Sequence, residues 1–394
     1  MASTNVTDVA YVKETVAGTT PATPSFQRLP VTGCNLAESF TTAVSEALRK
    51  DRMVDDLIIV DMDVNGGVPY ELTFEAYRPM IVSLLQGGAP VATVAIADAT
   101  DLSIVASTHT LASTTTDFEA ANIIQGMFLK ISGFTTAGNN GVFRVASVAE
   151  HAVVLEDPLS SLADEAAGDS VDVSGLCYRN GIAAPDSYTF RKSFSIPGKP
   201  EAIFYYRGCQ ISAMTFNFAT GSILNGEMTV NGLTGEGTTS AISGESIAGV
   251  PEYTLMNSVN SLTRVRLTGL PANAFFSSLN LTVDNGANPQ KGLAQLGARG
   301  IANFTLNITG TVELYFEDLS VYTIFKNSQG FLMSFTLQDG DGNIMVLTMP
   351  KVKFETLTEP VPGKDQFLME SGSVRALRDA TTNCQIQVDF FPAA

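Results

Sequence analysis

The stretch of sequence that decides the fold is ELTFE at residues 71–75, which returns as ELYFE at residues 313–317. Each copy alternates apolar residues with charged or polar ones, the pattern that predicts a β-strand with one buried face. Each copy also runs into a stretch with helical spacing, residues 77–85 after the first and residues 320–327 after the second. A strand followed by a short helix, occurring twice, indicates one fold used twice.

Segments further along the chain support this duplication. Residues 203–208 (IFYYRG) lead into QIS, and residues 345–350 (MVLTMP) lead into KVK. Five matching residues alone are compatible with chance similarity between two amphipathic strands, but the matching order of the later segments favours a duplication. A fold used twice in one chain predicts a component of a symmetric assembly.

The composition fits a β-rich protein whose surface contacts other subunits. Of the 394 residues, 45% are hydrophobic, which provides for a sizeable core, and only 16% are charged. The usual charged fraction is about 25%. Small polar and β-branched residues replace the missing charges, which suits sheet surfaces that touch other subunits. The length predicts two or three domains.

Charge and cysteine content exclude several classes of protein. The net charge of −17 argues against tight binding of nucleic acid, which needs clustered Lys and Arg, although it would suit a protein that must not adhere to DNA or simply one that is soluble. The four cysteines lie far apart and predict free thiols in a reducing compartment. We find no signal-peptide pattern and no apolar run of membrane-spanning length, so we expect a soluble protein made in a cytoplasm.

We expect a mainly β fold with two similar β-sandwich or barrel domains, each flanked by a short helix. Residues 1–33 are rich in Thr, Pro and Ala and predict an extended arm outside the core. The first domain comprises residues 34–88 together with residues 176–250, and the second comprises residues 251–394. Residues 89–175 predict a small β-rich module inserted into the first domain.

Four local patterns complete this description. Residues 36–52 carry apolar side chains at helical spacing and predict a further helix. Residues 57–63 predict a strand, and Asn-Gly-Gly at residues 65–67 predicts a turn. Residues 221–249 are rich in Gly, Thr and Ser and predict a long mobile loop.

No motif predicts catalysis, a cofactor or a metal. His109 and His151 lack a second His or a Cys at ligand spacing, and no Gly-x-Ser-x-Gly elbow accompanies them. Residues 339–343 (DGDGN) have alternating acids, but strand residues follow at once, so a hairpin turn is favoured over a calcium loop. The glycine-rich residues 232–237 lack the Lys-Ser/Thr of a phosphate loop. We therefore expect a protein that is not an enzyme.

Several segments, in this order along most of the chain, resemble the major tail tube proteins of long, non-contractile-tailed bacteriophages. The chain departs from the family pattern at Ala47 and Leu48, which replace an acid and an Ile, and in a longer loop at residues 233–249. The segments that carry the resemblance are residues 45–52 (SEALRKDR) with Asp56 and Leu57, 70–77 (YELTFEAY), 133–145 (GFTTAGNNGVFRV), 179–181 (RNG), 188–196 and 206–208 (YRG).

The resemblance implies a structural virion protein. Its subunits would form rings, and the rings would stack head to tail into a hollow tube that conducts the genome during ejection. Each tube-type domain would contribute its sheet to a continuous inner barrel. Relatives with one domain mostly form six-membered rings, so two domains per chain imply three chains with pseudo-sixfold symmetry, with six chains as the alternative. Implied partners are the tape measure, tail tip and tail terminator proteins, with assembly in the host cytoplasm and no membrane.

An acidic lumen would repel DNA and let it slide without specific binding. The candidates for lumen or ring-interface acids are Glu71, Glu75, Glu313 and Glu317, in the two copies of the repeated sequence. The arm at residues 1–33 and the loop at residues 221–249 are the candidates for contacts between stacked rings, and the inserted module should project outward.

Two other classes of protein remain open. A capsid or tail decoration protein would share the acidity and the β content, but it would not need a duplicated ring domain. A secreted carbohydrate-binding protein or adhesin is disfavoured, because the chain has no Trp and sugar-binding platforms are usually aromatic.

Overall fold

The computed structural model describes residues 7–156, 162–249, 253–271, 274–361 and 363–393. Strands dominate these ranges, which contain two α-helices, α1 (Phe74–Leu85) and α2 (Ser320–Lys326). The mainly β fold is confirmed, and both predicted helices are present. The strand predicted at residues 71–75 is wrong beyond Glu71, because β4 ends there and Phe74 and Glu75 open α1.

The first repeat is a sheet with α1 on its apolar face. The helix buries one side of its surface, and the Tyr77 ring lies 4.5 Å from that of Tyr70 on the sheet. In spatial order the strands are β1 (Thr7–Lys13), β12 (Tyr188–Phe194), β13 (Ala202–Ala219), β14 (Asn225–Gly232), β4 (Leu57–Glu71) and β3 (Ala37–Val44). Short strands extend this repeat: β2 (Ser25–Arg28), β15 (Thr234–Thr238) and β16 (Ser246–Ile247).

The second repeat has the same topology, with α2 in the place of α1. Its strands, in spatial order, are β17 (Leu262–Thr268), β22 (Phe331–Gln338), β23 (Ile344–Thr358), β24 (Met369–Ala376), β21 (Asn307–Tyr315) and β18 (Phe276–Asp284). A hairpin of β19 (Asn288–Lys291) and β20 (Ala298–Ala302) lies between β18 and β21, and β25 (Gln387–Phe391) adds to β23.

Strand pairing shows which residues of the two repeats are equivalent, and this alignment differs from that of the repeated sequences at residues 71–75 and 313–317. Gly66 pairs with Val230, next to a bulge in the β13–β14 ladder. Gly310 pairs with Val374, next to the corresponding bulge in the β23–β24 ladder. Gly66 therefore corresponds to Gly310, and Glu71 corresponds to Tyr315.

The neighbouring strands give the same alignment. A Cβ on Gly66 would lie 2.5 Å from the backbone of Leu36, and one on Gly310 would lie 2.9 Å from the carbonyl oxygen of Asn280. Glycine is required at both positions because the facing backbone leaves no room for a side chain. Leu281 pairs with Gly310 and is buried as Leu36 is, so these two leucines occupy equivalent sites.

The two repeats are joined into one sheet. Residues 213–219 of β13 pair antiparallel with residues 284–278 of β18. One hydrophobic cluster extends across this joint and includes Phe216 from the first repeat and Leu281 from the second. The repeats therefore share a core.

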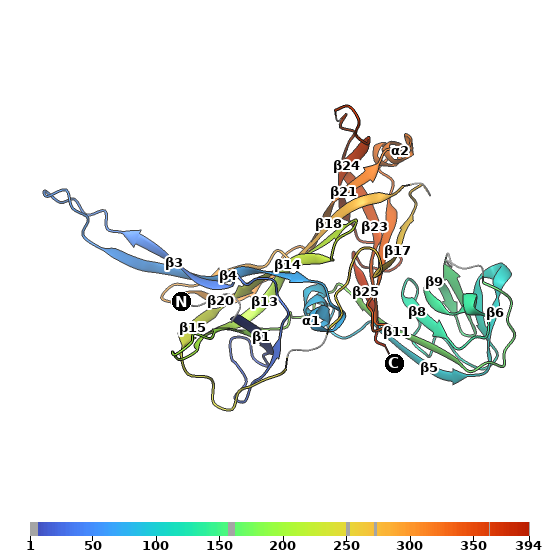
Figure 1. Cartoon of the computed structure of the whole chain (residues 1–394), viewed down its shortest axis with the longest axis horizontal. Helices are drawn as coiled ribbons and strands as arrows, with labels where there is room; N and C mark the ends of the chain where they lie inside the picture. Colours follow the sequence, from blue (N-terminus) through green and yellow to red (C-terminus); the bar gives the residue numbers. More distant parts are fainter. Residues whose placement is uncertain (1–6, 157–161, 250–252, 272–273, 362, 394) are drawn as a thin grey trace.

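In the described residues between α1 and β12, seven further strands form a module, which Figure 1 shows to one side of the sheet. It has its own buried cluster, which includes Phe118, Leu129 and Val173. Its last strand also pairs with β25 of the second repeat. The strands are β5 (Ala92–Ala99), β6 (Leu102–Val105), β7 (Thr110–Ser113), β8 (Phe128–Ser132), β9 (Gly141–Ala149), β10 (Ala152–Glu156) and β11 (Val171–Arg179).

Four further predictions of local structure are wrong. Residues 36–52 are not a helix, because they contain β3 and the tip of a long β3–β4 hairpin. The predicted turn at residues 65–67 lies inside the continuous strand β4. The described part of the predicted loop at residues 221–249 contains β14, β15 and β16, because small residues fit its crowded surroundings. Within residues 1–33, β1 joins the sheet and buries Val9 and Ala10.

Candidate functional site: a polar sheet face and a projecting hairpin

One face of the joined sheet is polar along its whole width. Strand alternation directs Val68, Phe216 and Leu281 into the core and turns their neighbours outward. Directly opposed residues form a row across both repeats, which we call the polar row. In order, this row is Glu71, Asn225, Asn217, Asn280, Thr311, Ser373 and Thr356.

Hydrogen bonds between side chains order the middle of this row. The Asn217 amide nitrogen donates to the Asn225 amide oxygen at 2.9 Å, and the Asn280 amide donates to the Asn217 oxygen. The last of these bonds crosses from the second repeat to the first. The amides of this part of the row are therefore held in place by one another.

Charges on this face are few and mainly acidic. Glu227 lies over Gly67, where a Cβ would meet its carboxylate at 1.6 Å. Glu313 accepts a hydrogen bond of 3.1 Å from the Ser278 hydroxyl. The Arg375 guanidinium is paired with the Glu355 carboxylate. An anion near the face therefore meets hydroxyls, amides and carboxylates more often than free cations.

The structure separates the four predicted acids into two pairs. Glu71 and Glu313 lie on strands and belong to the polar face. Glu75 is exposed in the first turn of α1, and Glu317 is exposed in the connection between β21 and α2. The sequence alone did not predict the Asn and Thr residues of the face, nor Glu227. Their signal was the alternation of small polar with apolar residues along β13, β14 and β18.

The second feature is the hairpin of β3 and β4, which projects far from the sheet in Figure 1. Six apolar side chains in its strands are each 50–58% exposed, although the base of the hairpin contacts the β19–β20 hairpin at Asp61, Met62 and Asp63. An isolated two-stranded ribbon with exposed apolar residues is typical of an interface. The six residues are Phe40, Val44, Leu57, Ile58, Ile59 and Val60.

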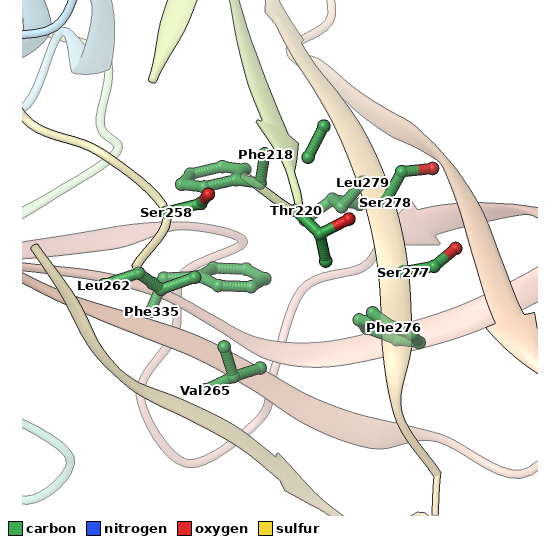
Figure 2. Close-up of a pocket in the computed structure, with 11 residues that line it drawn as sticks. Phe218, Thr220, Ser258, Leu262, Val265, Phe276, Ser277, Ser278, Leu279 and Phe335 are labelled. Atoms are coloured by element: carbon green, nitrogen blue, oxygen red, sulfur yellow. The ribbon is translucent and has the colours of Figure 1, made fainter. Parts of the chain in front are cut away.

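A small pocket lies at the joint of the repeats, and Figure 2 shows its lining. Its volume is about 80 Å³, and the Phe218 and Phe335 rings stack at its wall with centroids 4.9 Å apart. The opposite side carries Ser277 and Ser278, and no ionisable side chain lines it. The pocket is too small for an ordinary cofactor and reflects packing at the joint.

The buried ionisable side chain of Asp389 forms hydrogen bonds that stabilise the fold. Asp389 of β25 accepts hydrogen bonds from the Phe128 backbone nitrogen at 3.2 Å and from Gln387 Nε2 at 2.7 Å. Burial raises the pKa of Asp389 to about 7. These contacts tie the inserted module to the second repeat.

The two histidines and the acidic turn provide no metal site in the described chain. His109 and His151 are exposed, and His151 Nδ1 lies 2.9 Å from the Thr116 carbonyl oxygen. The segment at residues 339–343 is the predicted hairpin turn between β22 and β23. Within the described ranges, no three His, Cys, Asp or Glu side chains gather as metal ligands would. Neither described helix has the length and apolar character needed to span a membrane.

The described residues define a β-rich structural subunit with an extended polar face. A family model described as phage tail tube protein matches residues 4–379, so the chain belongs to the phage tail tube protein family. It is a structural component of a virion tail. No curated protein matches the chain.

Proposed function

We propose that this chain forms rings that stack into the tail tube, and that the polar face lines the lumen through which the genome passes. The observation that supports this proposal is the polar row, which continues across the joint of the two repeats. Two repeats per chain support a ring of three chains with pseudo-sixfold symmetry. The apolar side of the sheet, with α1 and α2, would then face outward.

The mechanism is passive. DNA carries one negative charge per ~1.7 Å of helix axis. A lumen lined by amides, hydroxyls and carboxylates such as Glu227 and Glu313 has few cationic side chains that could replace the counterions of the DNA phosphates. The genome would therefore pass without specific binding, and no catalytic step is involved.

The other parts of the molecule receive corresponding roles. The inserted module would stand on the outside of the tube, as decoration. The projecting hairpin replaces the arm at residues 1–33 and the segment at residues 221–249 as the candidate for contacts with other copies, because those two segments contain sheet strands. The predicted division into residues 34–88 with 176–250, 89–175 and 251–394 belongs to the same proposal. So do the tape measure, tail tip and tail terminator partners and assembly in the host cytoplasm.

Negative-stain electron microscopy of the concentrated protein, with native mass spectrometry of the rings, tests the proposal. We expect hollow striated tubes or stacked rings, and three chains in each ring. Six chains per ring would contradict the pseudo-sixfold arrangement. Particles that stay monomeric, even with tail-tip components added, would contradict self-assembly of this chain.

A further inference from the structure

The joint between β13 and β18 shows how one repeat receives an edge strand of the other. In this joint Ala213 lies opposite Asp284, and Ala219 lies opposite Ser278. The β13 edge is open there because β12 pairs only with the earlier part of β13, as far as Cys209. The last strand in the spatial order of the second repeat, β18, occupies this open edge.

The second repeat has the same open edge. Its β23 bulges between Phe354 and Thr356, and β22 pairs only with the part before this bulge. In the first repeat the bulge lies between Ile211 and Ala213. Thr356 therefore corresponds to Ala213, and residues 356–361 correspond to residues 213–218, which receive β18.

The first repeat has the counterpart of β18. Leu36 corresponds to Leu281, so Ser39 corresponds to Asp284. Within the described chain β3 pairs only with β4, which leaves its outer edge without a strand partner. Lys192 Nζ, from β12, donates to the Leu36 carbonyl at 2.5 Å, so a side chain and not a strand satisfies this carbonyl.

We infer that residues 34–39 of one chain pair antiparallel with residues 356–361 of the next, in the register of the internal joint. Ser39 then lies opposite Thr356, and Ala37 lies opposite Thr358. The inference rests on the proposed function, because it names the edges by which the ring closes.

This register extends the polar face from one chain to the next. Within the chain, Ala213, Asp284 and Asn307 form a row across the joint. Their counterparts are Thr356, Ser39 and Asp63, of which Ser39 already lies opposite Asp63. A head-to-tail contact of this kind generates a closed ring when its rotation matches that of the internal joint. The new joint also removes the two unpaired edges.

Disulfide crosslinking of assembled tubes tests the register. The variant Ser39→Cys with Thr356→Cys is made in a Cys34→Ser background, because Cys34 lies beside the seam and is only partly buried. Opposed residues of an antiparallel pair have Cα atoms ~4.5–5.5 Å apart, within the range that a disulfide spans. We expect mild oxidation to give a ladder of covalently linked chains in non-reducing gels.

Matched variants make the outcome specific. Ala37→Cys with Thr358→Cys should crosslink as well, whereas Ser39→Cys with Glu359→Cys should not, because the two residues are out of register. All these positions are exposed, so the thermal unfolding of each variant should match that of the parent. Crosslinking of the out-of-register pair alone would overturn the inference.

The inference and the proposed function fail in different ways. Rings or tubes that form but give no crosslink at either in-register pair would overturn the inference and leave the tube intact. A parent protein that forms no rings under any tested condition would overturn the proposed function, and the inference with it.

Discussion

The same position in the two repeats carries two very different hairpins. In the second repeat, the β19–β20 hairpin folds back on the first repeat, where Lys291 binds Asp61 and Asp63 and Gly297 lies against Met62. In the first repeat, the equivalent β3–β4 hairpin projects away from the molecule and exposes its apolar residues. One hairpin finds its contacts within the chain, and for the exposed apolar residues of the other we propose a partner from another chain.

The largest expected effect comes from removing apolar residues of the projecting hairpin. Leu57→Ser with Ile59→Ser should abolish tube assembly, because both side chains are exposed in the chain and available for a partner. Electron microscopy and sedimentation measure assembly. The monomer should keep its melting temperature within a few degrees.

Ile182→Ser is the matched control, since Ile182 is an exposed apolar residue outside the hairpin. Equal loss of assembly in both variants would show that general surface hydrophobicity, and not the hairpin, drives assembly.

The next effect tests whether Leu36 and Leu281 occupy equivalent sites in the two repeats. Leu36→Ala and Leu281→Ala should each lower the free energy of unfolding by about 2–5 kcal/mol, because each deletes a buried side chain next to a required glycine. Urea denaturation measures this change. A negligible cost at Leu36 beside a large cost at Leu281 would contradict the alignment of the repeats.

The pH dependence of stability tests the contact between the inserted module and the second repeat, which Asp389 helps to form. The pKa of Asp389 is raised by burial to about 7, above its unfolded value of about 3.9. The protonated carboxyl therefore contributes stability that is fully present below pH ~4 and is lost as the pH rises through about 7. Asp389→Asn should remove this part of the pH dependence, with a slope of up to ~1.4 kcal/mol per pH unit.

Urea unfolding of both proteins at a series of pH values between ~4 and ~8 gives that slope. Glu75→Gln, at an exposed position on α1, serves as the control and should leave the slope unchanged. Parallel pH profiles for the parent and Asp389→Asn would contradict the titration of Asp389.

The smallest effect concerns the lumen. Glu313→Lys places a cation on the polar face, whereas Glu317→Lys places one in the loop after β21. We expect slower genome ejection for Glu313→Lys only, because phosphates would bind the added cation. Dye-monitored ejection from virions carrying each variant measures the rate. Equal rates for both variants would contradict the assignment of the polar face to the lumen.

Local sequence patterns predicted those elements that bury an apolar side within the chain. The spacing of Tyr77, Ile81 and Leu84 predicted α1, since all three pack on the sheet. The same spacing misled at residues 36–52. Leu36 is buried in the sheet, but Phe40, Val44 and Leu48 are exposed on the projecting hairpin. Exposed apolar residues at this spacing carry no signal in the sequence that distinguishes them from core residues.

The polar face was largely beyond prediction for a different reason. Its order depends on which strands lie side by side, and Asn217 is 63 residues from Asn280. The Gly- and Thr-rich strand β14 resembled a loop because Gly226 must fit against Tyr70 and Thr215, where a side chain would clash. The correct alignment of the two repeats was likewise visible only from strand pairing, in which Gly66 pairs with Val230 and Gly310 pairs with Val374.

The internal β13–β18 joint has a consequence for the concentration at which tubes form. A contact between two parts of one chain forms during folding, and its effective concentration is fixed by the connection between them. In a ring of such chains, joints within a chain alternate with joints between chains. The joints within each chain have already formed before any chains meet. Only the remaining joints depend on protein concentration, so fusing the two repeats lowers the threshold for assembly without any stronger contact.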